Sequence, residues 1–139
     1  MPERQEQTIE VLQAGVVHKA TVSWWYTDRR WTVRVESTEF DDIEQVADDA
    51  FEALCQVREL LEPKGWHLGV AGGQAEVWPS GMARDQGGGL RAYRLTEQGV
   101  GGLVDTFAPV DPATVTTVAE QKAEAERLFS EMRHRSHPS

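Results

Sequence analysis

The chain has 139 residues, of which 40% are hydrophobic and 27% charged, and its formal net charge is −9. This length suits one globular core, so we expect residues 1–139 to form a single domain. The negative charge argues against nucleic-acid binding, which needs clustered Lys and Arg. No apolar run approaches the ~18 residues of a spanning helix, so we expect no membrane partner.

The N-terminal segment is polar and acidic, which is the opposite of a secretory signal. We expect residues 1–8 to form a loose arm. The only cysteine, Cys55, can form no internal disulfide. A reducing compartment fits this best, and we therefore expect a cytoplasmic protein.

Two strands are expected next in the chain. Residues 16–26 are rich in Val, Thr, Trp and Tyr, which suit a pleated surface. After a polar break, residues 31–36 alternate apolar and polar, which predicts a hairpin in an antiparallel sheet covered on one side. Trp24 and Trp25 must point to opposite faces of their strand. One of them is thus expected off the core, either as an interface anchor or under the N-terminal arm.

Residues 41–62 hold eight acids and one base, a net charge of −7. Their apolar side chains follow the i, i+3, i+4, i+7 template, so we predict one helix here. Asp41 and Glu44 have capping-box spacing at its start. Glu44, Asp48 and Glu52 would then share one anionic face, which is either solvated surface or a docking surface for a cationic partner.

The second half of the chain predicts several short strands and one more helix. We expect strands in residues 65–70, 75–78, 90–95 and 103–107, a helix opening at the Thr117–Glu120 capping box, and a frayed tail over residues 134–139. The order strand, strand, helix, three or four strands, helix predicts an α+β fold. Its expected form is a two-layer sandwich, with about five or six mostly antiparallel strands and two helices on one face.

A glycine-dense loop occupies residues 79–89, and six of the twelve glycines fall between Gly72 and Gly89. Glycine lets the backbone approach a ligand closely, at an entropic cost. The loop is therefore either a binding element or a mobile hairpin connection. If it closes a pocket against the sheet, the expected polar lining is Ser80, Arg84, Asp85 and Tyr93, and the protein would be a small-molecule-binding domain or an enzyme.

The sequence carries no motif that fixes a reaction. Ser80 lacks the Gly-x-Ser-x-Gly elbow of a nucleophile, and the glycines are followed by neither Gly-Lys-Ser/Thr nor a helix. The four histidines lack metal-ligand spacing. We therefore expect no catalytic residue, metal site or cofactor.

Several segments together resemble a group of small bacterial cytosolic proteins thought to act as immunity proteins beside secreted toxins. The segments are Phe40–Ile43, Glu62–Trp66, Pro79–Gly89, Val104–Phe107 and Thr117–Gln121. The resemblance spans most of residues 17–132. It implies a binding role and brings no catalytic motif with it.

Our leading hypothesis from the sequence is a non-enzymatic immunity protein that neutralises a toxin. The acidic helix would dock onto the cationic active site of a basic toxin domain, and the loop would add specificity. The expected partner-binding residues are Asp41, Glu44, Asp48, Asp49, Glu52, Ser80, Met82, Arg84 and Asp85. A third possibility, an adaptor or self-assembling subunit, predicts an exposed apolar patch instead.

Overall fold

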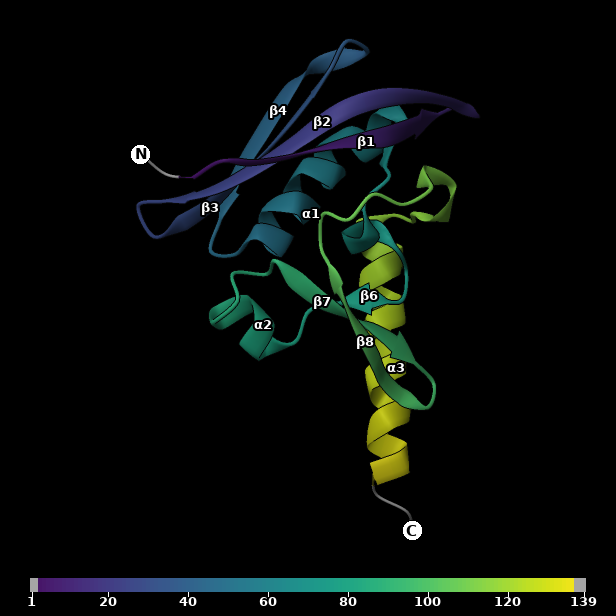
Figure 1. Cartoon of the computed structure of the whole chain (residues 1–139). Coiled ribbons are helices and arrows are strands. Elements are labelled where there is room, and N and C mark those ends of the chain that lie inside the picture. The colour runs from purple at the N-terminus through teal and green to yellow at the C-terminus, as the bar shows by residue number, and fades with distance from the viewer. Residues whose placement is uncertain (1–2, 137–139) are drawn as a thin grey trace.

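A computed structural model describes residues 3–136 and shows two antiparallel sheets with three α-helices (Figure 1). The strands are β1 (Gln5–Gln13), β2 (Val16–Thr27), β3 (Arg30–Ser37), β4 (Phe40–Ala47), β5 (His67–Leu68), β6 (Val77–Trp78), β7 (Arg91–Thr96) and β8 (Gly99–Asp105). The helices are α1 (Ala50–Leu61), α2 (Gly81–Asp85) and α3 (Val118–Ser136), with short 3-10 turns at Glu62–Lys64, Ala71–Gly73 and Pro112–Thr114. None of the described helices is long and apolar enough to cross a membrane.

The larger sheet has five strands in the order β4-β3-β2-β1-β5. Its first two hairpins close through two-residue turns with positive φ, at Ala14–Gly15 and Asp28–Arg29, a geometry that matches the twist of the strands. The core side chains of this sheet, including Val11, Val22 and Val33, pack against the apolar face of α1. The expected hairpin is thus confirmed.

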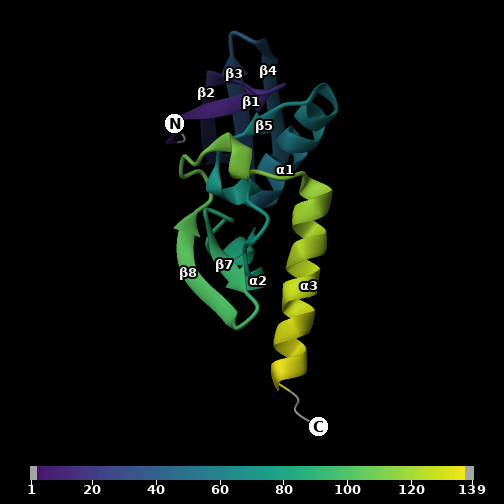
Figure 2. The same cartoon turned by 90° about the vertical axis from the view of Figure 1, so that its right-hand side faces the viewer.

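The smaller sheet has the order β6-β7-β8, and α3 packs against it (Figure 2). Ala125 and Leu128 of α3 are buried on Leu95 of β7. The helix opens at the predicted capping box, because the Glu120 N–H donates to Thr117 Oγ1 over 3.1 Å. The predicted α+β class is confirmed. Since the strands divide between two sheets, however, α1 and α3 cover different sheets.

The predicted helix over residues 41–62 is wrong in its N-terminal half. Residues Phe40–Ala47 form β4, which pairs with β3 so that Ile43 lies opposite Val35. The helix begins only at Ala50, where the Asp49 side chain accepts the Glu52 N–H over 2.8 Å. The Asp-x-x-Glu spacing occurs at both 41–44 and 49–52, and only the second pair caps a helix.

Two expected loops also contain regular structure. The expected loose arm, residues 1–8, supplies the start of β1, which begins at Gln5 and pairs along its length with β2. The loop over 79–89 contains α2, capped by Ser80, whose side chain accepts the Ala83 N–H over 3.0 Å. The expected frayed tail is helical to Ser136, and residues 137–139 lie outside the described part of the chain.

Candidate functional site

The glycine-rich loop is held against the start of α1. Gly88 accepts the Ala50 N–H over 2.7 Å, and both Gly88 and Gly89 have positive φ, at 66° and 73°. A Cβ at Gly88 would lie 2.7 Å from the Trp31 ring, and one at Gly89 would lie 2.7 Å from Asp49 Oδ1. These glycines are needed because the backbone packs directly onto an indole ring and a helix cap.

Arg84 joins this loop to two of the predicted acidic residues. Its guanidinium lies 3.3 Å from Asp49 Oδ2 and 3.7 Å from Glu52 Oε2. The same group lies over the rings of Phe51 and Trp78, at 5.1 and 5.4 Å from their centroids. Asp49 and Glu52, two of the predicted partner-binding acids, therefore hold the loop in place by pairing with Arg84.

The remaining acids do not form one anionic face. Asp41 and Glu44 lie exposed on β4, and Asp48 lies in the turn before α1. Arg34 of β3 pairs with Glu44 at 3.4 Å, and Arg30 pairs with Asp48 at 3.7 Å. The predicted row of Glu44, Asp48 and Glu52 is thus wrong, because a strand and a turn replace the helix that would align them.

Arg34 is the centre of a group of ion pairs on the outer face of the larger sheet. It also contacts Asp42 at 2.6 Å and Glu36 at 3.3 Å. Although desolvation lowers the pKa of Arg34, the charges of Asp42 and Glu36 raise it overall. The edge strand β4 is therefore acidic but partly neutralised, and exposed charge on an edge strand discourages unwanted strand pairing.

A groove lies between the larger sheet and the loop that follows α2. Three adjoining hollows form it, of about 300, 290 and 570 Å³, and Leu90 lines all three. Trp24 lines the first two, and Tyr26 and Trp31 line the last two. With Phe107, these residues define what we call the aromatic groove, namely Trp24, Tyr26, Trp31, Leu90 and Phe107.

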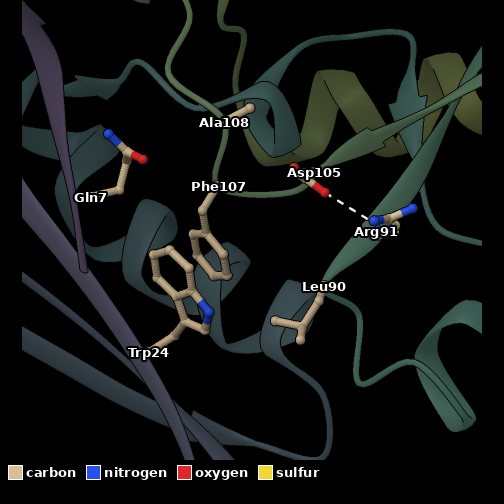
Figure 3. Close-up of a pocket in the computed structure, with 7 residues that line it drawn as sticks. All are labelled: Gln7, Trp24, Leu90, Arg91, Asp105, Phe107 and Ala108. Atoms are coloured by element: carbon tan, nitrogen blue, oxygen red, sulfur yellow. Dashed lines mark ion pairs between the residues drawn. The ribbon is translucent and has the colours of Figure 1, made fainter. Parts of the chain in front are cut away.

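The rings in this groove contact one another in pairs. Trp24 stacks on Phe107 with centroids 4.1 Å apart and planes 10° apart (Figure 3). Tyr26 lies 5.3 Å from Trp31 and is 51% exposed. Figure 3 also shows Gln7 across from Ala108, and the Arg91–Asp105 ion pair at the rim. Rigid aromatic surface with a few polar groups suits the binding of apolar side chains at low entropic cost.

The two adjacent tryptophans face opposite sides, as the sequence predicted. Trp24 lies in the groove, and Trp25 lies on the outer face with the Arg4 guanidinium 4.6 Å from its ring centroid. Trp25 is therefore the residue that the N-terminal segment covers. Of the two alternatives expected for the tryptophan off the core, the structure thus shows cover by the N-terminal segment, whereas Trp24 lies on the core side and lines the groove.

The predicted loop residues separate into different environments. Arg84 and Asp85 line the 570 Å³ hollow together with Asp48. Ser80 caps α2, and Tyr93 packs against the α3 cluster. Contrary to the expectation, neither residue lines that hollow. Met82 is 69% exposed on α2.

Neither Cys55 nor His18 lines the groove. Burial raises the pKa of the Cys55 thiol to about 12, which keeps it protonated. His18 lies 3.5 Å from Glu39 and edge-on to Trp66, at the opposite end of β2 from Trp24. Within residues 3–136, no group of three His, Cys, Asp or Glu side chains could hold a metal ion.

Sequence reasoning did not find Tyr26, Leu90 or Phe107 as site residues. Each reads as an ordinary strand residue, and the three come from separate parts of the chain that only the tertiary fold brings together. The available signal was Trp24, one of the adjacent tryptophans.

No protein-family model matches the sequence, and a comparison with curated proteins finds no match.

Proposed function

We propose that this chain is a non-enzymatic binding protein that holds a partner protein in the aromatic groove. The observation that carries the proposal is the continuous groove through Trp24, Tyr26 and Trp31, with its rings in contact in pairs. Large aromatic side chains of this kind dominate binding energy at protein interfaces. The net charge of −9 favours encounter with a basic partner.

The biological form we propose is toxin neutralisation, with a basic toxin domain as the partner. Its support is the net charge together with the sequence resemblance described above. The docking surface that we propose differs from the one expected from the sequence. Because arginines pair with Glu44, Asp48 and Glu52, we assign binding to the groove and give the acids a role in long-range attraction.

The first experiment compares which proteins are captured from the native cell by three forms of the chain. Tyr26→Ala removes a half-exposed ring from the groove, whereas Leu60→Ala removes a similarly exposed apolar side chain of α1 that lines none of the three hollows. The partner should bind the wild type and Leu60→Ala, and should bind Tyr26→Ala about 30-fold more weakly, as expected for loss of a ~2 kcal/mol contact. Equal capture by all three forms would contradict the proposal.

Toxin neutralisation has its own test. The captured partner is expressed alone and together with this chain in a host that lacks both. The proposal expects growth arrest with the partner alone, restored growth with the wild-type chain, and weaker restoration with Tyr26→Ala. If the partner alone leaves growth unaffected, it is not a toxin, and the proposal is reduced to the binding role.

A small-molecule site is the second candidate, favoured by the 570 Å³ hollow. This hollow brings Arg84, Asp85 and Asp48 beside the rings of Tyr26 and Trp31, which is the mixture of polar and aromatic groups found in ligand pockets. A bound metabolite recovered from protein purified from its own cell, and absent from the Tyr26→Ala variant, would favour this candidate over a protein partner.

A further inference from the structure

The edge of the larger sheet beside the aromatic groove has an open strand position. Strand β5 covers only the end of β1, pairing with Val11 and Leu12. After β5, Gly69 donates its N–H to the Glu10 carbonyl over 2.8 Å, and the chain then turns away from β1 at Val70. Within the described residues, Gln5–Ile9 therefore has a strand neighbour only on its β2 side.

The backbone groups that face this open edge can be assigned from the hydrogen-bond pattern. The Gln13–Val16 pair closes a two-residue hairpin, so the odd-numbered residues of β1 bond to β2. The Glu10 carbonyl points the other way, and so by alternation do the N–H and C=O groups of Glu6 and Thr8. The Thr8 carbonyl accepts only the side-chain amide of Gln7, over 3.2 Å, among the described residues.

At Glu10, the position beside β1 is filled by Gly69 and the next one by Val110. Val110 donates its N–H to the Gly69 carbonyl over 2.9 Å, so residues 109–110 lie two strand positions from β1. Two hollows, of about 300 and 430 Å³, adjoin β1 in this region. The first is lined by Gln7 and Ala108, and the second by Thr8–Glu10 and Pro109–Asp111, together with Lys19 of β2. We call the space of these two hollows the strand gap.

We propose that the strand gap receives an extended segment of the partner protein, which pairs with Gln5–Ile9 as an added strand. This inference rests on the proposed function and names how the partner binds. Unpaired main-chain groups on an accessible sheet edge, next to a pocket for alternate side chains, are the elements of strand addition. The paired stretch of about five residues would be ~17 Å long.

The two faces of the added strand would meet different surroundings. Side chains opposite Gln7 would point into the aromatic groove, toward Trp24 and Phe107. Side chains on the other face would lie beside Glu6 and Glu10, which pair with Arg4 at 3.6 Å and with Lys19 at 3.7 Å. The segment should therefore carry apolar residues at every second position, and the net charge of −9 favours a segment that is cationic as a whole.

A second copy of this chain fits the gap poorly. Residues 107–110 line its far side, where the edge of a second folded sheet would meet them, whereas a single extended segment is narrower. Two chains of net charge −9 would also repel each other. An extended segment from a different, cationic protein is the occupant that satisfies both conditions.

The test uses the full chain and a phage library of random nonapeptides. Selected peptides should carry apolar residues at every second position and a net positive charge. Methylating their backbone nitrogens one at a time should weaken binding at least about tenfold at every second position, since only alternate N–H groups face β1. An absence of enriched peptides, or a methylation profile without a period of two, would overturn strand addition.

The protein side of the pairing is tested at Thr8. Thr8→Pro removes the N–H that faces the gap and leaves the β1–β2 bonds intact, because proline is tolerated where a strand N–H faces outward. Thr8→Ala keeps the N–H and is the matched control. We expect at least about tenfold weaker peptide binding for Thr8→Pro and less than about threefold for Thr8→Ala. If Thr8→Pro does not fold by circular dichroism, the methylation profile decides.

Failure of this inference can be told apart from failure of the proposed function. If Tyr26→Ala weakens binding of the captured partner while Thr8→Pro and peptide methylation have no effect, the groove binds and strand addition is wrong. If Tyr26→Ala has no effect on that partner, the proposed function itself is wrong.

Discussion

Replacing Arg58 by methionine should destabilise the protein strongly, because Arg58 holds three parts of the fold together. Its guanidinium is buried, at 2% exposure, and donates to the Thr116 carbonyl over 2.7 Å and to Gln121 Oε1 over 2.5 Å. It also reaches the carbonyls of Gly72 and Gly73, over 3.2 and 3.4 Å. Helix α1 is thereby tied to the start of α3 and to the turn before β6.

The expected magnitude follows from which acceptors lose every partner. In Arg58→Met, the Gly72 carbonyl keeps the Gln121 amide and the Gly73 carbonyl keeps the Thr116 N–H. The Thr116 carbonyl and Gln121 Oε1 lose their donor. An unsatisfied buried acceptor costs about 1–3 kcal/mol, which applies in full to Gln121 Oε1 and less to the part-buried Thr116 carbonyl. Glu62, 17% exposed, also loses its ion pair with Arg58 at 4.0 Å, while the variant no longer buries a charge, so we expect a net loss of about 2–4 kcal/mol.

Urea denaturation measures this loss, with Arg30→Met as the matched control. Arg30 pairs with Asp48 at 3.7 Å, but both side chains are more than half exposed, and exposed pairs contribute less than about 1 kcal/mol. With a slope of ~2 kcal/mol per molar urea, Arg58→Met should lower the midpoint by about 1–2 M. A free energy of unfolding within about 1 kcal/mol of that of Arg30→Met would refute the reasoning.

Two further predictions concern the thiol of Cys55 and the packed glycines. Because burial raises the pKa of Cys55 from 9.0 to about 12, its protonated form stabilises the fold below pH 9, and this contribution disappears as the pH rises to 12. Urea unfolding should therefore show wild type losing stability relative to Cys55→Ala across that interval, and a constant difference would contradict the assignment. Gly88→Ala should cost about 2 kcal/mol or more in thermal or urea unfolding, because a Cβ would meet the Trp31 ring at a positive φ. Gly81→Ala, in α2 with nothing within 4 Å, should be neutral or slightly stabilising, and equal losses for the two would refute this explanation.

The fold could be predicted from the sequence where the local signals were unambiguous. Strict alternation from Trp31 to Glu36 identified β3, and the Thr117–Glu120 box identified the start of α3. The segment around Ile43 failed because its apolar positions fit a helix as well as a strand. The choice between them is made by pairing with Arg34 and Val35 of β3, which is a tertiary interaction.

The candidate site could be predicted only in part. The loop was identified by its glycines and Arg84, because unusual composition marks a place where the backbone approaches another group closely. The groove was missed because its wall at Gln5–Gln7 lies in a polar segment that reads as a loose arm. Pairing with β2 makes that segment a strand, and packing of Leu90 and Phe107 beside it makes the groove.

Amide hydrogen exchange of the chain with and without its captured partner tests the central claim most directly. We predict that the partner slows exchange in Gln5–Ile9 and in residues 87–91 and 105–108, while exchange in β4, Phe40–Ala47, stays unchanged. Slower exchange along β4 with no change at the groove would contradict the claim and would place the binding surface on the acidic strand β4 instead.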